Sequence, residues 1–133
     1  MDSSVRNVFT YIEKCFNVAG STPIVSLFSG TLRAIAGKVQ TLAGAIMATV
    51  GFIGFLINHN QKWAGITNIG SEFIIHGALN TLRGLGEALL CAYTLVGNVL
   101  LLIPNMSKKE PFSPFFTYGT LSNPELRQRS IYI

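Results

Sequence analysis

The sequence is poor in charged residues and in cysteine. Only 12% of its 133 residues are Asp, Glu, Lys or Arg, against about 25% in a typical soluble domain, and the mean hydropathy is +0.43. So few charges solvate the surface of a small domain poorly, and the composition therefore favours lipid as the solvent for part of the chain. The only cysteines, Cys15 and Cys91, cannot build a disulfide framework, and we expect both to be free, buried thiols.

Several function classes lack their sequence signals. The net charge of +4 is scattered and forms no basic stripe beside aromatic residues, which argues against a nucleic-acid partner and fits positive flanks on membrane segments. Charged residues interrupt the N-terminus, so it does not look like a signal peptide. His59 and His76 have no cysteine or carboxylate at ligand spacing, and no GxSxG motif is present. We therefore predict a protein that is not an enzyme, with no catalytic residues, metal, cofactor or evident small-molecule substrate.

Two long uncharged runs dominate the chain. Residues 39–58 would form a helix of roughly 30 Å, about the thickness of the hydrocarbon layer of a bilayer. Residues 88–103 form a similar run. We predict two membrane spans at about 39–58 and 85–104, with Trp63 as an interface anchor just past the first span. The region between them would be a polar connection over 59–69 and a second amphipathic stretch over 71–83.

The remaining segments complete an all-α fold. Residues 4–18 have the spacing of an amphipathic helix whose apolar side we expect to pack on the hairpin, with Glu13 among the polar residues of the opposite side. Ser21-Thr22-Pro23 predicts the start of a helix reaching Asn58, with Gly30 and Gly37 as weak points. We expect one helical membrane domain, residues 1–104, followed by an irregular tail, 105–133, with one short helix at roughly 124–130.

A shift of fifty residues aligns two parts of the chain. Thr31-Leu32-Arg33 falls on Thr81-Leu82-Arg83, and Gly20-Ser21 falls on Gly70-Ser71. This alignment predicts two similar helical units, 20–53 and 70–103, which we interpret as an internal repeat.

Small residues and one ion pair are the candidate sites. Small residues spaced four apart let membrane helices approach closely, and the candidates are Gly44, Ala48, Gly84, Ala88 and Ala92. Arg83 and Glu87 are also four apart and predict an interfacial ion pair. A role of Glu87 in handling protons or ions is the alternative reading of that carboxylate.

The basic residues predict the orientation. Arg33 and Lys38 precede the first run, and Lys108 and Lys109 follow the second. Because positive flanks stay on the cytosolic side, a two-span hairpin would place both termini there.

Two resemblances bear on function. Residues 116–121, Phe-Thr-Tyr-Gly-Thr-Leu, resemble the YGTL loop that opens the gamma-glutamylcyclotransferase domain, but only twelve residues follow Leu121, so we treat the match as coincidental. The bilobed hydrophobic region, residues 20–103, resembles small membrane proteins of chlamydia-type intracellular bacteria, including the inclusion-membrane class. That resemblance implies a host-derived membrane, termini in the host cytosol and a role in interaction.

Three functions follow from these observations. The first is a small non-enzymatic integral membrane protein that acts through helix packing and its tails, with the bilayer, copies of itself or another membrane protein as partners. The second is a pore-former of the holin or viroporin type, for which Gln40, Thr41, Thr49, Thr94 and Asn98 would supply the polar face. The third is a soluble, apolar helical bundle.

Overall fold

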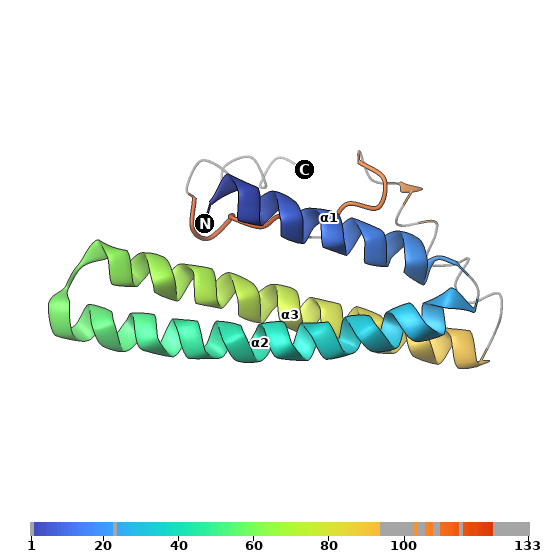
Figure 1. Ribbon diagram of the computed structural model, residues 1–133, viewed down its shortest axis with the longest axis horizontal. Coiled ribbons are helices and arrows are strands. Elements are labelled where there is room, and N and C mark those ends of the chain that lie inside the picture. The colour runs from blue at the N-terminus through green and yellow to red at the C-terminus, as the bar shows by residue number, and fades with distance from the viewer. Residues whose placement is uncertain are drawn as a thin grey trace.

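The computed structural model confirms that the fold is all-α. Within the part of the chain that it describes there are three helices and no strand: α1 (Ser3–Gly20), α2 (Val25–Asn58) and α3 (Gln61–Tyr93) (Figure 1). The described residues are 2–22, 24–93, 103, 106, 107, 110–114 and 116–123.

Helices α2 and α3 form a long antiparallel hairpin (Figure 1). Only His59 and Asn60 connect them, and His59 ends α2 in the left-handed conformation (φ 49°, ψ 25°). The predicted connection over 59–69 is therefore wrong, because α3 runs without a break from Gln61 to Tyr93, and the amphipathic stretch over 71–83 is part of this one helix. Residues 61–83 contain no proline, and the polar side chains that suggested a loop lie on one helix, some of them facing protein.

A seam of glycines joins the two long helices. On α2 they occur every seventh residue, at 30, 37, 44 and 51, and on α3 they occur at 70, 77 and 84. Gly37 faces Gly77, where a Cβ atom would lie 2.5 Å from the opposite carbonyl oxygen, and Gly44 faces Gly70 in the same way. Gly30 and Gly37 are thus contact points and not the weak points that we expected.

The spacing of seven explains why the seam persists along the hairpin. A seven-residue repeat keeps the same side of each helix facing its partner when the two helices supercoil slightly. With glycine at every contact the backbones approach closely, so dispersion between backbones holds the pair together where large apolar side chains are missing.

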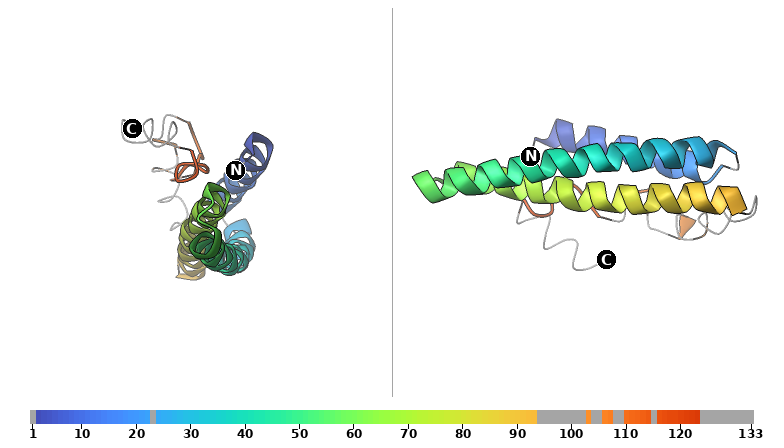
Figure 2. Two further views of the ribbon diagram at one scale, coloured as in Figure 1. Left: turned by 90° about the vertical axis from the view of Figure 1, so that its left-hand side faces the viewer. Right: turned by 90° about the horizontal axis from the view of Figure 1, so that it is seen from below.

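Helix α1 lies over the hairpin, and the side that faces inward carries both polar and aromatic residues. It covers the part of the hairpin remote from the His59–Asn60 turn, and the end that holds this turn projects beyond it (Figures 1 and 2). Glu13 and Asn17 are buried, while Val5, Val8 and Ile12 are exposed. The predicted packing face is therefore correct only in part. Phe9 and Phe16 do face the hairpin, with the Phe9 ring 5.2 Å from that of Phe73, but Glu13 is buried beside them because the hairpin offers polar groups that need polar partners.

The residues that the structure describes have an inverted distribution of polarity, with polar side chains buried and large apolar ones exposed. Ala34 and Tyr118 are the buried hydrophobic residues of the described chain, whereas the buried polar and charged ones include Glu72, His76 and Glu87. Leu, Ile, Val and Phe side chains line the outside of α2, with Ile57 73% exposed. Cys15 is exposed as well, contrary to the expectation of a buried thiol.

Some predictions fall on residues outside the described ones. These are most of the second uncharged run, the short helix at 124–130, and the side chains of Cys91 and Ala92. The two aligned units differ where both are described, since Gly20 ends α1 and Gly70 lies within α3. The duplication stays a prediction.

Candidate functional site

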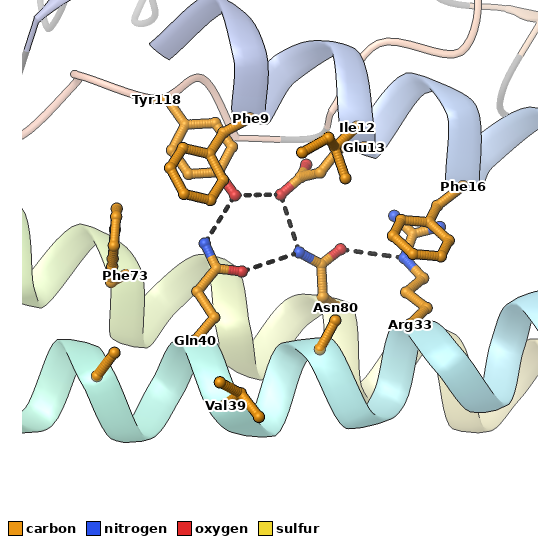
Figure 3. Close-up of a pocket in the computed structure, with 12 residues that line it drawn as sticks. Phe9, Ile12, Glu13, Phe16, Arg33, Val39, Gln40, Phe73, Asn80 and Tyr118 are labelled. Carbon is orange, nitrogen blue, oxygen red and sulfur yellow. Dashed lines mark hydrogen bonds between the residues drawn. The ribbon is translucent and has the colours of Figure 1, made fainter. Parts of the chain in front are cut away.

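A cluster of buried polar side chains lies between α1 and the hairpin, and we call it the polar core. Its members come from all three helices and from the segment after them (Figure 3). They are Glu13, Arg33, Gln40, His76, Asn80, Glu87 and Tyr118.

Glu13 is the centre of one half of the polar core. Its Oε1 atom accepts hydrogen bonds from the Tyr118 hydroxyl at 2.6 Å and from Asn80 Nδ2 at 2.9 Å (Figure 3). Nδ1 of His76 lies 3.2 Å from the same oxygen, and the His76 ring stacks on Tyr118 with centroids 3.5 Å apart. Gln40 donates from Nε2 to the Tyr118 oxygen at 2.8 Å, and its Oε1 accepts from Asn80 Nδ2 at 3.4 Å, which closes the ring of contacts (Figure 3).

The proton between Glu13 and Tyr118 belongs to Tyr118. Burial alone would raise the pKa of Glu13, but hydrogen bonds from His76, Tyr118 and Asn80, and the charge of His76, outweigh it and lower the pKa. Burial and the neighbouring Glu13 carboxylate raise the pKa of Tyr118. The pair is therefore a carboxylate that accepts from a neutral hydroxyl.

Glu87 is the centre of the other half. Its Oε1 atom accepts from Arg33 Nη1 at 3.1 Å and from Arg83 Nε at 2.9 Å, and the Glu87 side chain has no exposed surface. The carboxylate occupies the space in which a side chain at Gly20 would lie, so glycine is required where α1 ends. Asn80 links the two halves, because its Oδ1 accepts from Arg33 Nε at 3.0 Å.

A third buried carboxylate, that of Glu72, anchors the segment that follows the helices. Residues 118–122 wrap around Glu72 so that the backbone N–H groups of Gly119, Leu121 and Ser122 donate to its two oxygens at 3.1, 2.6 and 2.9 Å. Gly119 has φ 91°, which suits glycine in so tight a turn. The YGTL sequence is thus a loop that binds a carboxylate of its own chain, and this part of the predicted tail is docked on α3.

A cavity of about 340 Å³ lies beside the polar core, between α1 and the hairpin (Figure 3). Its walls are mainly apolar and include Phe9, Ile12, Phe16, Val39, Ala43 and Phe73. Glu13 and Arg33 face it from the polar side. This volume is in the range of small-molecule sites.

The structure places the predicted packing residues along the seam. Gly44 lies against Gly70 and the backbone of Ile74, while Ala48 lies against Gly70. Gly84 lies against Gly30 and Ala34, with Ala88 beside Gly30. Ala92 lies in α3, and its side chain is outside the described residues.

The predicted ion pair and interface anchor have different surroundings from those expected. Arg83 and Glu87 do contact each other, but Glu87 also pairs with Arg33 and is fully covered by protein. Trp63 lies in the first turn of α3, next to the hairpin turn, with its ring against Gly54 of α2.

The sequence carried two signals that spacing alone could have revealed. The glycines repeat every seven residues, and Glu72, His76, Asn80, Arg83 and Glu87 follow one side of α3 at intervals of three or four.

Among the described residues, no group of three or more His, Cys, Asp or Glu side chains could hold a metal ion. Comparison with models of protein families, with curated proteins and with solved structures finds no match to this chain.

Proposed function

We propose that the protein is a small, non-enzymatic membrane protein whose glycine-seamed hairpin enters the bilayer. The observation that carries this proposal is the outer surface of α2. Its most apolar eighteen-residue stretch has a mean hydropathy of 1.8, yet only 17% of that stretch is buried. A core helix of a soluble monomer has the opposite pattern, because its apolar side chains face protein.

The seam supports the same interpretation. In water, a hairpin gains stability by burying large apolar side chains between its helices, whereas in lipid close backbone contact through glycine replaces that gain. Here the large side chains point outward and the glycines inward. Lipid tails would cover the outward side chains at no cost in exposed hydrocarbon surface.

The polar core supports a role in interaction. Its carboxylates, guanidinium groups and amides bind one another, and this fixes α1 and residues 118–122 on one part of the hairpin. We propose that this covered part, with the two terminal segments, presents a surface to partners. The resemblance to inclusion-membrane proteins would place that surface in a host cytosol, with one span near 39–58. The second predicted span, 85–104, begins in the covered part of α3, where Glu87 belongs to the polar core, and is not part of this proposal.

Cysteine accessibility in vesicles tests the membrane placement. Single cysteines at Asn60, Ser71 and Ser107, in a chain with serine at positions 15 and 91, are treated with a maleimide that cannot cross the bilayer. If the chain crosses twice, Asn60 and Ser107 react from opposite sides of the bilayer. If only α2 crosses, Asn60 and Ser107 react from the same side, and this side is opposite to that of the N-terminal helix α1. The proposal would be contradicted if all three sites reacted equally without detergent and the protein appeared in the supernatant after a carbonate wash.

The structure gives less support to the pore-forming alternative than to the interaction role. Gln40 bonds to Tyr118, and the Thr41 hydroxyl donates to the Gly37 carbonyl at the seam, so both are used within the chain. Thr94 and Asn98 are outside the described residues. Dye release from liposomes separates the two functions, because an interaction protein leaves the vesicles intact.

A further inference from the structure

We propose that the cavity between α1 and the hairpin is a binding site for a neutral amphiphile that carries one hydroxyl group on a hydrocarbon body. This site goes beyond the proposed function, since it does not depend on whether α2 crosses a membrane. It lies against the polar core and is lined mainly by the rings and aliphatic side chains of Phe9, Ile12, Phe16, Val39 and Phe73 (Figure 3). It is open to the outside where Ile12 and Val39 are exposed.

The apolar wall selects the body of the ligand. A cavity of about 340 Å³ with such a wall gains most from displacing water with hydrocarbon. Aliphatic and aromatic bodies both fit this requirement.

Two buried polar groups select its head. Oε1 of Glu13 is fully used by Tyr118, Asn80 and His76, but the described residues give no hydrogen bond to Oε2. Arg33 uses Nε for Asn80 and Nη1 for Glu87, and the described residues give none to Nη2. Glu13 is 6% exposed and Arg33 3% exposed, and both line the cavity. Glu13 Oε2 and Arg33 Nη2 are therefore the acceptor and the donor that these two lining side chains have left for a ligand.

The charges around the cavity favour a neutral head. Glu87 already pairs with Arg33, and Glu13 is already stabilised by three donors. An anion or a cation would enter without a free counter-charge and would lose its hydration. A hydroxyl group donates to Glu13 and accepts from Arg33, so it satisfies both groups and leaves the charge unchanged.

Methyl NMR of the full-length protein tests the site. The chain is prepared in whichever medium, buffer or detergent, keeps it monodisperse, and is titrated with four compounds of equal chain length. These are decan-1-ol, decyl methyl ether (which accepts but cannot donate), decanoate and decyltrimethylammonium. We expect saturable shifts at the Ile12 and Val39 methyl groups with decan-1-ol, no saturable shift at Ile57 near the hairpin turn, and affinity about tenfold weaker for the other three.

Two alanines of α2 give matched variants. Ala43→Leu fills the cavity and should abolish the saturable shifts, whereas Ala45→Leu lies on the exposed side and should leave them intact. The proposal is overturned if a charged compound binds as tightly as decan-1-ol, if the methyl ether does, or if Ala43→Leu binds like the parent. It is overturned equally if none of the compounds shifts Ile12 and Val39 saturably. None of these results bears on the membrane proposal, which the cysteine experiment tests separately.

Discussion

The two ends of the hairpin are built on the same glycine seam but are surrounded differently. The tip half, residues 45–58 and 61–69, contains a single charged residue, Lys62, and projects beyond α1 (Figure 1). The covered half, residues 25–44 and 70–93, carries the polar core and is overlain by α1 and residues 118–122. The same glycine packing thus serves both halves, and the halves differ in what covers them: α1 covers one and does not reach the other (Figure 1). In the proposed function, lipid would cover the tip half.

The largest expected effect belongs to the covered half. Replacing Arg33 by methionine leaves the buried Glu87 with one cation in place of two and Asn80 Oδ1 without its donor. Because a buried charge that loses its partner is strongly destabilising, we expect Arg33→Met to lower the free energy of unfolding by about 3–5 kcal/mol. Chemical denaturation followed by circular dichroism measures this loss.

Lys38 provides the matched control for Arg33. It is an exposed cation on the same helix, and Lys38→Met should change the stability by less than about 0.5 kcal/mol. Equal effects of the two substitutions would show that the polar core does not distinguish the halves.

The next effect concerns the loop over Glu72. In Glu72→Gln an NH2 group replaces one of the two carboxylate oxygens, and it cannot accept a hydrogen bond from the backbone N–H groups of residues 119–122. We expect a loss of about 3 kcal/mol and release of the loop, because buried donors would lose charge-assisted bonds. Limited proteolysis around Tyr118 should become fast in this variant. Unchanged protection would mean that Glu72 does not hold the loop.

The seam itself should respond to added methyl groups. Gly37→Ala places a Cβ atom 2.5 Å from the Gly77 carbonyl oxygen and 2.6 Å from the Thr81 nitrogen, so the helices must separate. We expect a loss of about 1–3 kcal/mol, measured by thermal unfolding. Gly65→Ala meets nothing within 4 Å and should stabilise α3 by about 0.5–1 kcal/mol, since alanine favours a helix. A larger loss of stability in Gly65→Ala than in Gly37→Ala would contradict the role of the glycine seam in packing the two helices.

The smallest effect is the acid response of Glu13. Its pKa is lower in the folded protein than the ordinary value of 4.5, so the unfolded chain takes up a proton first as the pH falls. The stability that Glu13 contributes is therefore complete above about pH 4.5 and is lost as the pH falls through the folded pKa. Glu13→Gln should flatten this acid limb of stability. If the acid limb of stability is unchanged in Glu13→Gln, Glu13 is not its cause.

The sequence predicted the helices better than their partners. The 3.6-residue period and the uncharged run located α1 and α2, because those signals are local. The inward side of α1 was found only in part. The pattern ranks Phe9 and Val8 as buried, but only Phe9 faces the hairpin, and Glu13 is buried because its partners include His76 and Asn80 of α3. Local hydropathy contains no information about a polar partner sixty residues away.

The candidate site was predictable only in part. Arg83 and Glu87 are a local pair and could be found by spacing, but the contact of Glu87 with Arg33 depends on the hairpin register. That register was readable from the glycines at intervals of seven, had both helices been taken as continuous. The role of residues 118–122 was not readable, because a loop that binds Glu72 through backbone N–H groups requires only glycine at one position.

The most direct test of the account measures what touches the outer face of α2. A spin label at Ile46, which is 58% exposed, is compared in lipid vesicles with one at Asn60 in the turn. We predict that the label at Ile46 collides readily with oxygen, which concentrates in lipid, and little with a water-soluble nickel chelate, whereas the label at Asn60 shows the opposite preference. Equal access of the nickel chelate to both labels would contradict the claim that lipid covers this helix.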